Sequence, residues 1–561
     1  MKHVRNIIGL TLLAVSLAPL SFAHVSLKNG NFFIPFKDLV YPGGYEPKIE
    51  RVYNSKTSYV GYFGWGWGTE FEAYLTVSVD GSVTVHEYGG GATNRFTPVK
   101  FNAAELAKTV SMLADTARSI GQPVNEQYKN KLRTDADFRN QEWVRFLKTG
   151  KVKARHLADG EQLVSTNYSY QYITKTAGGY VRKYDNGKVE KYDDAGHLIQ
   201  ISDTNNNFVQ LSYAPDGRLS KMVDNFNRKM FFTFNKRGRI ERIEGESKKE
   251  TSYKYNDQDE LVYSKDADGN IAFYKYSTDK RHNMTEIAFT EKANNKKTVT
   301  EVAYWSKDKF ENVKSVKEGD TITEYDYVYD KPEKGYSAVS SSIKNLEGNV
   351  ITSSKYEYWT KPASKPFGEP WTYKMASTID GDKTETIYNE CCGLPLEITR
   401  DGQKTAFAYD VKGRVTSKST PSETTKLAYN DKVGRVSRVD RFSKGSKKLH
   451  YWSEFTYDGK GNLQLAKNSD RKTVKLVYDL NGRISAMVDQ DSRKLSFKYN
   501  EQSKPVEIKD EKLGAITVSY TNSGDVKSVN TAAGRKIAMQ VTSAFQNLLE
   551  IIRPAGVNLS F

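Results

Sequence analysis

An aromatic residue recurs at a nearly constant interval through two long stretches of the chain, and this repeat constrains the fold more than any other feature. In the first stretch the aromatic residues are Tyr192, Tyr213, Phe234, Tyr255 and Tyr276. In the second they are Tyr388, Tyr409, Tyr429, Tyr457, Tyr478, Tyr499 and Tyr520, and only the interval from Tyr429 to Tyr457 is clearly longer than the others. Periods of about 20 to 50 residues are the signature of repeat architectures, and this interval lies at the short end of that range. We therefore expect one stacked structural unit to make up most of the chain.

The repeated unit reads Tyr, then Asp or Asn, two variable residues, Gly, Arg and a hydrophobic residue. The glycines and the arginine that we assign to it are Gly196, Gly217, Arg218, Gly238, Gly413, Gly434 and Gly482. Asp or Asn opens a turn by bonding the backbone two residues on, and Gly supplies a positive φ. A second turn signal, midway between consecutive aromatic residues, occurs at Asp203, Asp224, Asp266, Asp489 and Asp510. Each unit is predicted to be two strands and two turns, with the aromatic ring stacked on its equivalent in the neighbouring hairpin.

The fold class predicted from these units is all-β with a small helical insert. One hairpin cannot bury its own face, so the units must stack into a long sheet that forms a spiral, a shell or a partial barrel. The composition agrees, because 36 Tyr, 25 Phe and 40 Gly against 8 Met favour many short strands and turns. Residues 291–375 keep the alternation of strands but lose the period, which indicates degenerate or longer hairpins of the same sheet.

A helical signal occurs at residues 102–150. Asn102 with Glu105 resembles a capping box, apolar residues follow at helical spacing, and Gly121 ends the helix. A second helix is predicted from near Asp135 to Thr149, and we expect the pair to form a cap or plug at one end of the sheet. The predicted organisation is a signal peptide (1–23), an opening β domain (24–101), the helical insert (102–150), a first repeat array (151–290), degenerate hairpins (291–375), a second repeat array (376–530) and a C-terminal tail (531–561).

The N-terminus has the pattern of an export signal. Lys2 and Arg5 precede an apolar stretch, and residues 20–23 end in a plausible cleavage site at Ala23. The stretch is short for a membrane span, which disfavours the alternative of an uncleaved anchor, and no Cys follows it as in a lipoprotein. A bilayer-spanning helix needs an apolar run of about 20 residues. The rest of the chain has no such run, so we expect no transmembrane span in the mature chain and a secreted, periplasmic or cell-surface protein.

The chain is basic, with 84 Lys and Arg against 68 Asp and Glu and a formal charge of +16. A basic exported protein is attracted to anionic surfaces such as outer-membrane lipid, wall polymer or another polyanion. The alternative is a solvated surface of mixed charge. The partners considered are therefore an anionic surface polymer or polysaccharide, or an enclosed protein. Export argues against nucleic acid as a partner, and the sequence does not set the oligomeric state.

The two cysteines are adjacent, Cys391 and Cys392, so no disulfide framework holds the fold. A vicinal disulfide, an intermolecular bridge and two unreacted thiols are the alternatives. We favour unreacted thiols or a strained local bridge. Burial of a core must supply the stability.

Catalytic and metal-binding motifs are not evident in the sequence. His-Glu-x-x-His, Gly-x-Ser-x-Gly and the phosphate-binding Gly-x-x-x-x-Gly-Lys motif do not occur. Cleavage after Ala23 would make His24 the N-terminus, where its amine and ring could bind copper with His86 as second ligand. An unliganded terminal histidine is the favoured alternative. We predict no catalytic residues and no cofactor.

Trp65 and Trp67 are the candidate ligand-binding residues. Two nearby indoles can form a platform on which sugar rings stack. Packing within the core or at the end of the sheet is the alternative, and we favour it. The binding assignment therefore depends on how much of each ring is exposed.

The repeated unit resembles the YD repeats of Rhs proteins, bacterial relatives of insecticidal-toxin shell subunits and of teneurin barrels. Residues 25–30, 51–55 and 61–67 resemble the domain that opens many Rhs proteins, and the two resemblances together cover most of residues 25–530. The resemblance implies a β-sheet ribbon that spirals into a hollow shell, which often encloses a C-terminal toxin released by self-cleavage. Here the expected Asp-Pro-x-Gly motif does not occur near the end, and the tail after the repeats is too short for a toxin domain. We therefore expect neither self-cleavage nor toxin activity in this chain.

Together these observations predict an exported β-shell that acts as a non-catalytic binding or encapsulating scaffold at the cell envelope or surface. About a dozen units can be recognised, so a partial barrel or an open spiral is an alternative to a sealed shell. One alternative function is a secreted protein that binds or modifies wall or surface polysaccharide. A second is a shell for a separately encoded toxin.

Overall fold

The structure is a computed structural model that describes residues 24–531 with short gaps, and five residues beyond them. The gaps are 42, 99–102, 166–170, 280, 307–309, 330–334, 363–369, 391–392, 446, 502 and 521–525, and the five further residues are Met539, Ser543, Gln546, Leu548 and Ile551. The predicted signal peptide, the capping residue Asn102 and the pair Cys391 and Cys392 lie outside the described residues. Within the described part, no helix is both long enough and apolar enough to span a membrane.

The chain begins with a small unit, residues 24–72, which we call the opening unit. It contains β1 (His24–Val25), β2 (Phe32–Val40), β3 (Lys48–Asn54), β4 (Val60–Gly61), β5 (Gly64–Trp65), β6 (Trp67–Thr69) and a 3-10 turn, η1 (Glu70–Glu72). Strands β1, β2, β3 and β6 pair in that order as an antiparallel sheet, and β4 pairs with β5. Alternate residues of β2 and β3 are buried, as expected for strands with one face in a core.

Every later strand belongs to one antiparallel sheet. It starts with β7 (Tyr74–Val77), β8 (Val83–His86) and β9 (Thr93–Pro98). The first array follows as β10 (Gln162–Ser165), β11 (Tyr172–Thr176), β12 (Gly179–Lys183), β13 (Val189–Tyr192), β14 (Leu198–Ser202), β15 (Phe208–Tyr213), β16 (Leu219–Asp224), β17 (Lys229–Phe234), β18 (Ile240–Gly245), β19 (Glu250–Tyr255), β20 (Leu261–Lys265), β21 (Ile271–Tyr276) and β22 (Met284–Thr290), with a 3-10 turn η2 (Glu246–Lys248) after β18. Each strand pairs with its neighbours in sequence.

The sheet continues through longer strands into the second array. The middle strands are β23 (Lys297–Tyr304), β24 (Val313–Glu318), β25 (Thr321–Tyr329), β26 (Tyr336–Asn345), β27 (Val350–Lys361) and β28 (Trp371–Ile379). The second array contains β29 (Asp382–Tyr388), β30 (Pro395–Arg400), β31 (Gln403–Tyr409), β32 (Val415–Ser419), β33 (Glu423–Asn430), β34 (Arg435–Ser443), β35 (Leu449–Tyr457), β36 (Leu463–Asn468), β37 (Thr473–Tyr478), β38 (Ile484–Asp489), β39 (Lys494–Tyr499), β40 (Pro505–Asp510), β41 (Gly514–Tyr520) and β42 (Val526–Thr531).

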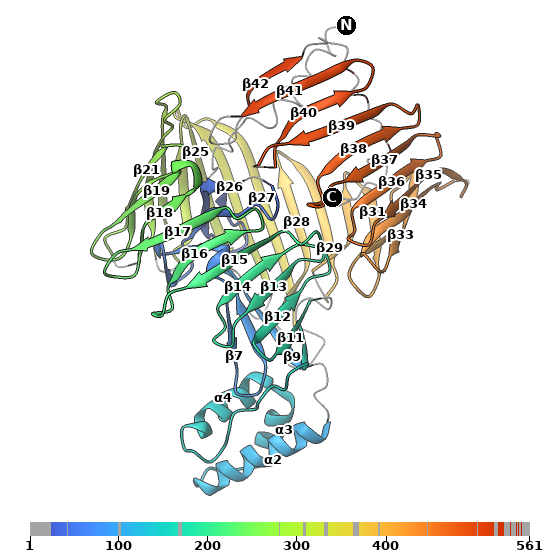
Figure 1. Cartoon of the computed structure of the whole chain (residues 1–561). Helices are drawn as coiled ribbons and strands as arrows, with labels where there is room; N and C mark the ends of the chain where they lie inside the picture. The colour runs from blue at the N-terminus through green and yellow to red at the C-terminus, as the bar shows by residue number, and fades with distance from the viewer. Residues whose placement is uncertain are drawn as a thin grey trace.

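The resulting sheet of 36 strands curves round on itself (Figure 1). Among the described residues, no strand ladder joins the last strand, β42, to the first, β7. The sheet is therefore an open spiral. The predicted all-β fold class is confirmed. Of the forms considered, an open spiral fits and a sealed shell does not, because a sealed shell would need a ladder between β42 and β7.

In repeats that carry both the Asp and the Arg of the motif, these two residues hold the turn. In the turn after Tyr409, Asp410 Oδ1 accepts hydrogen bonds from the backbone N–H groups of Lys412 and Arg414, both at 2.9 Å. Its Oδ2 accepts from Arg414 Nε at 2.7 Å. The six glycines assigned to the motif, Gly196, Gly217, Gly238, Gly413, Gly434 and Gly482, have φ between 68° and 89°. One carboxylate thus caps the turn and orients the arginine, and Gly supplies the left-handed backbone.

In most units the Tyr hydroxyl is hydrogen-bonded to the unit before it. It donates to a backbone carbonyl 14 or 15 residues earlier, at 2.5 to 2.9 Å, in seven copies of the motif: Tyr213, Tyr255, Tyr276, Tyr409, Tyr429, Tyr499 and Tyr520. In each case the acceptor is the carbonyl of the first residue of a strand, the strand that follows the turn of the preceding unit. These bonds join consecutive units beyond the sheet ladder itself.

The predicted stacking between equivalent aromatic rings was wrong. The rings of consecutive units are two strands apart, about 9.6 Å, which exceeds the usual separation of stacked rings. Instead, the motif arginine of one unit covers the ring of the next. Arg414 lies 4.3 Å from the Tyr429 ring centroid, and Arg483 lies 4.7 Å from that of Tyr499. A cation–π contact therefore replaces the expected ring stack.

Three helices lie between β9 and β10: α2 (Ala103–Ser119), α3 (Glu126–Thr134) and α4 (Ala136–Leu147). Asn125 and Asp135 cap α3 and α4 by accepting from backbone N–H groups at 2.8 Å. The helices share a small core that includes Leu113, Leu132 and Phe146. They project beyond the β7–β9 end of the sheet and outside its curve (Figure 1). Helix α3 is one that the sequence pattern did not predict.

Two motif glycines in different surroundings should respond differently to alanine. Gly217 (φ 80°) has open space where a Cβ would be, so Gly217→Ala should cost about 1 kcal/mol from backbone strain alone. At Gly482 (φ 76°) the same Cβ would lie 2.4 Å from Asn205 Cγ, so Gly482→Ala must also displace that side chain. We expect a thermal unfolding midpoint clearly lower for Gly482→Ala than for Gly217→Ala. Equal midpoints would contradict the tight contact at Gly482.

Candidate functional site

One face of the large sheet is apolar along both arrays. In the first array Leu211 and Met222 are buried, and they stand two residues before and nine residues after the anchor Tyr213. In the second array Leu476 and Met487 are buried and stand at the same positions relative to Tyr478. Because the register is the same, the two pairs lie on the same face of the sheet. We call it the concave face, because the sheet curves around it (Figure 1).

The opening unit occupies the concave face of the first array. Arg51 on β3 is 0% exposed, and its Nε lies 2.6 Å from Asp38 Oδ2. Arg51 Nη2 also donates to Ser264 Oγ on β20 at 2.7 Å and to the Tyr274 hydroxyl on β21 at 2.9 Å. The Tyr253 hydroxyl on β19 donates to Asp38 at 2.8 Å. A buried ion pair of the opening unit is thus held by three consecutive strands of the first array.

Trp65 and Trp67 both lie at this contact. Trp67 is 0% exposed, and its indole N–H donates to the Tyr276 hydroxyl at 3.1 Å. Trp65 is half-buried and stacks on His282, with ring centroids 4.0 Å apart. The imidazole Nδ1 of His282 lies 2.8 Å from Glu260 Oε1. A fully buried indole offers no platform to solvent, so Trp67 cannot form an exposed platform with Trp65.

Glu72 of the opening unit is a buried carboxyl without a cation. It accepts hydrogen bonds from the Tyr62 backbone N–H at 2.6 Å, the Thr69 hydroxyl at 2.9 Å and the Tyr59 hydroxyl at 3.3 Å. Among the described residues no Lys, Arg or His forms an ion pair with it. Burial raises the pKa of Glu72 to about 7, although the three hydrogen bonds act in the opposite direction. This carboxyl therefore changes its charge near neutral pH.

Part of the C-terminal tail occupies the concave face of the second array. The five described residues of the tail are helical, Ile551 is 0% exposed, and Leu548 packs against the same apolar cluster. The buried hydroxyl of Ser453 donates to the Ile551 carbonyl at 2.9 Å. Sequence reasoning assigned no role to the tail, although Leu548 and Ile551, three residues apart, are an apolar signal of this contact.

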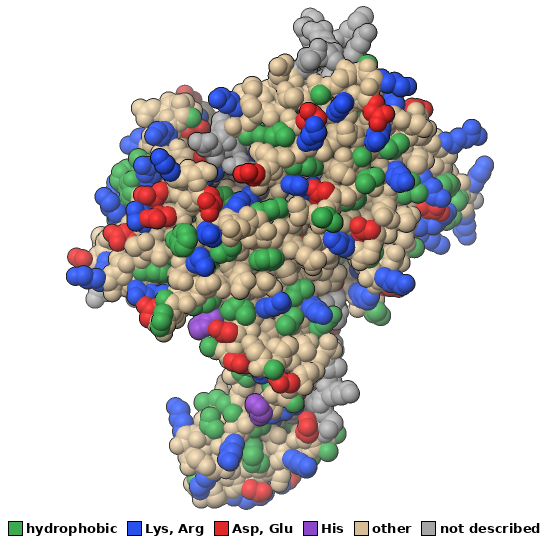
Figure 2. All heavy atoms as spheres, viewed as in Figure 1, with side chains coloured by type: hydrophobic (Ala, Val, Ile, Leu, Met, Phe, Trp, Pro, Cys, Tyr) green, Lys and Arg blue, Asp and Glu red, His purple; other side chains and the backbone are tan. Residues whose placement is uncertain are grey.

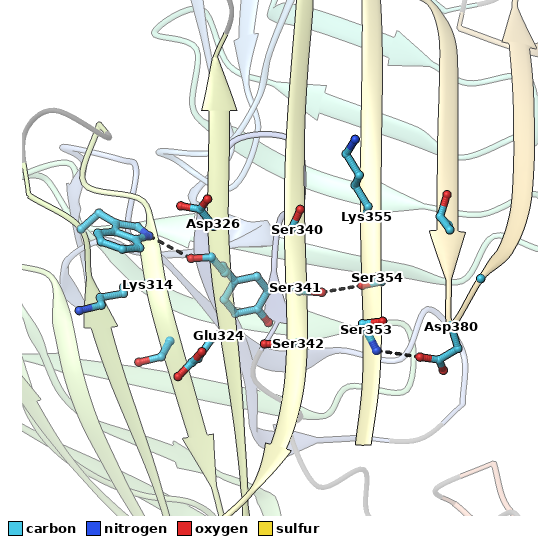
Figure 3. A pocket seen from close by; sticks show the side chains of 15 residues that line it. Lys314, Glu324, Asp326, Ser340, Ser341, Ser342, Ser353, Ser354, Lys355 and Asp380 are labelled. Atoms are coloured by element: carbon cyan, nitrogen blue, oxygen red, sulfur yellow. Dashed lines mark hydrogen bonds between the residues drawn. The ribbon is translucent and has the colours of Figure 1, made fainter. Parts of the chain in front are cut away.

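A separate cavity of about 600 Å³ lies along strands β24–β28 (Figure 3). Its labelled lining is polar: Lys314, Glu324, Asp326, Ser340, Ser341, Ser342, Ser353, Ser354, Lys355 and Asp380. The Ser341 and Ser354 hydroxyls are 2.6 Å apart, and Asp380 accepts from the backbone N–H of Ser353 at 2.8 Å. None of the lining residues is His or Cys, so no histidine is present there to activate a hydroxyl. The lining can hydrogen-bond a polar ligand.

One arrangement of Ser, His and Glu occurs on the surface of the second array. Ser443 Oγ lies 3.3 Å from His450 Nδ1, and His450 Nε2 lies 3.0 Å from Glu423 Oε2. Arg441 binds the same carboxylate at 2.7 Å. A catalytic triad also needs a water-excluding site with oxyanion donors. Ser443, His450 and Glu423 line none of the described cavities, so the arrangement meets only part of that requirement.

Of the two histidines considered for copper, only His86 has a described side chain. The His86 ring stacks on Tyr74 with centroids 4.3 Å apart, and its Nε2 lies 3.1 Å from Thr76 Oγ1. Burial lowers the pKa of His86. The His24 side chain lies outside the described atoms. Within the part of the chain that the structure describes, no group of three or more His, Cys, Asp or Glu residues could hold a metal ion.

Two family profiles match the sequence at its two ends. Residues 23–96 match a domain of unknown function, DUF6531, and residues 446–561 match the teneurin YD-shell. The first match covers the opening unit with β7, β8 and most of β9. The second covers the end of the second array and the C-terminal tail. Among curated proteins, no sequence matches the chain.

Among solved structures, the chain is similar to a TccC3 variant in the Photorhabdus luminescens Tc holotoxin pore, at 11% identity and a TM-score of 0.41. It is also similar to TcdB2-TccC3, at 11% identity and a TM-score of 0.41, and to TcdB2-TccC3 without the hypervariable C-terminal region, at 12% identity and 0.38. The matches cover 88%, 88% and 94% of this chain, and 27%, 28% and 28% of the other chains. The chain thus spans little more than a quarter of their length. The two profile matches, together with the Tyr-Asp-x-x-Gly-Arg turns seen in the structure, support an Rhs/YD-repeat type of protein with a β-shell scaffold fold.

Proposed function

We propose that this protein is an exported, non-catalytic β-shell that holds polypeptide against its concave face at the cell envelope or surface. The observation that carries the proposal is the burial of Ile551 on the second array, where the Ser453 hydroxyl binds its carbonyl. A scaffold that already binds its own tail in this way can enclose polypeptide joined to that tail. The export pattern of residues 1–23 supports the location.

A protease-site experiment tests the enclosure. A flexible peptide with a protease site is added after Phe561, and the same peptide is inserted as a control at Gly121, which lies in the exposed turn after α2. We expect cleavage at the C-terminal site to be at least tenfold slower than at Gly121. In an Ile551→Asp variant, the lost apolar contact should release the tail and remove the difference between the sites.

Two outcomes bear on the proposal. Equal cleavage rates in the unsubstituted protein would refute enclosure of the tail. Slow cleavage that persists in Ile551→Asp would show that protection does not depend on the concave-face contact. Export is checked on the same protein by its mass after expression with the leader, which should match a chain that begins at His24.

A further inference from the structure

Turns of the first array touch turns of the second array along a line that we call the inter-array seam. Asn205 and Asn462 exchange two side-chain hydrogen bonds, at 3.0 and 2.8 Å. Asn207 Nδ2 donates to the Asn481 carbonyl at 3.2 Å. A Cβ on Gly434 would lie 3.2 Å from the Asp185 carbonyl oxygen. The spiral therefore brings together turns that are far apart in sequence, 257 residues in the case of the asparagine pair.

A cavity of about 560 Å³ lies on this seam, and its lining is strongly basic. Six cationic side chains line it against two carboxylates; the cations are Lys183, Lys412, Arg414, Lys432, Arg435 and Lys460. In contrast, the cavity along β24–β28 has two cations against three carboxylates, and a cavity along β35–β37 has two against two. Figure 2 shows basic and acidic side chains interspersed over the visible face of the molecule. The seam cavity is therefore a local concentration of the excess positive charge.

Several donors in this cavity are available to a ligand. Within the described residues, the ammonium groups of Lys183, Lys432 and Lys460 have no carboxylate partner. Arg414 is bound by Asp410 at 2.7 Å and by Asp431 at 2.9 Å, but its Nη1 is buried and has no hydrogen-bond acceptor. Like charges gathered from two arrays repel each other, and a bound anion would remove that repulsion.

From these observations we propose that the seam cavity binds a polyvalent phosphate-class anion that bridges the two arrays. Guanidinium and ammonium groups together are the usual ligands of phosphate oxygens. The volume suits a small ligand with several phosphate groups. Asp431, which is 75% exposed and pairs with Arg414 and Lys412, is the group that such an anion displaces or repels.

Binding is tested on the full mature chain with tripolyphosphate as the probe, by calorimetry and by thermal unfolding. Tripolyphosphate should raise the unfolding midpoint, because a ligand that binds only the folded state stabilises it. Lys432→Gln with Lys460→Gln should weaken binding at least tenfold. The matched control, Lys236→Gln with Lys296→Gln, removes the same charge from exposed lysines that do not line the cavity and should leave binding unchanged. Asp431→Asn should tighten binding several-fold.

The results that would overturn the proposal are specific. An equal loss of tripolyphosphate affinity in the seam variant and in its control would mean that binding depends on net charge alone. Citrate binding as tightly as tripolyphosphate would exclude a phosphate-class site. Hydrogen exchange provides an independent measurement, because a bridging ligand should slow exchange in residues 184–188 and 431–435 together. Slower exchange in only one of these turns would contradict a bridge between the arrays.

Discussion

Replacing Arg51 with methionine is expected to destabilise the contact between the opening unit and the first array by about 3 to 5 kcal/mol. Arg51 is fully buried, and its removal leaves the Asp38 carboxylate without its cation in a site with no exposed surface. The hydroxyls of Ser264 and Tyr274 each lose one hydrogen-bond partner and keep the bond to each other. Thermal unfolding and limited proteolysis should show the loss, with the opening unit released before the second array is digested.

The double variant Arg51→Met with Asp38→Leu separates the charge effect from the packing effect. Replacing both members of a buried pair by apolar side chains is often close to neutral, so we expect it to recover at least half of the lost stability. Arg242→Met is the surface control, because Arg242 pairs with Glu244 at an exposed site and should cost less than about 1 kcal/mol. If Arg51→Met lowers the stability no more than Arg242→Met does, the buried pair does not hold the opening unit.

The repeat could be predicted from the sequence because its causes are local. Asp410, Gly413 and Arg414 lie within five residues, and their hydrogen bonds close a single turn. The same local signals repeated along the chain require a stacked sheet, whatever its curvature. The ring contacts were predicted incorrectly because they depend on the distance between strands, and Arg414 reaches the Tyr429 ring where another Tyr cannot.

The functional surfaces could not be predicted because they join distant residues. Asp38 and Tyr253 are 215 residues apart, and Asn205 and Asn462 are 257 apart. No period or motif in one segment indicates which other segment the curvature will bring to it. The contact of the tail could be predicted only in part. Ile551 stands in an apolar run, which indicates that it is buried but does not indicate which strands bury it. The net charge was visible in the sequence, whereas its concentration at the seam follows from the winding of the sheet.

Stability should fall as pH rises from about 4.5 to about 7 because of Glu72. Its pKa is raised to about 7 in the folded protein, against an ordinary value of 4.5, so the folded state binds the proton more tightly than the unfolded state. The contribution is fully present below pH 4.5 and is lost as pH rises through 7. Above that pH the folded state must bury an ionised carboxylate without a cation, at a cost of about 3 kcal/mol.

Glu72→Gln should remove this dependence, because glutamine keeps an acceptor for the Tyr62 N–H and has no charge to bury. We expect the variant to unfold at a higher temperature than the unsubstituted protein at pH 8 and at a similar temperature at pH 4.5. Glu241→Gln, at an exposed position on β18, is the matched control and should leave the difference in unfolding temperature between the two pH values unchanged.

Ionisation of Glu72 should also loosen the opening unit where it meets β16 and β18. The reason is that the Tyr62 carbonyl accepts from the Ile240 N–H and the Tyr62 hydroxyl accepts from the Leu219 N–H. Proteolysis of the opening unit should accordingly be faster at pH 8 than at pH 5 in the unsubstituted protein, whereas in Glu72→Gln the two rates should be equal. A pH effect of equal size in both proteins would show that another group causes it.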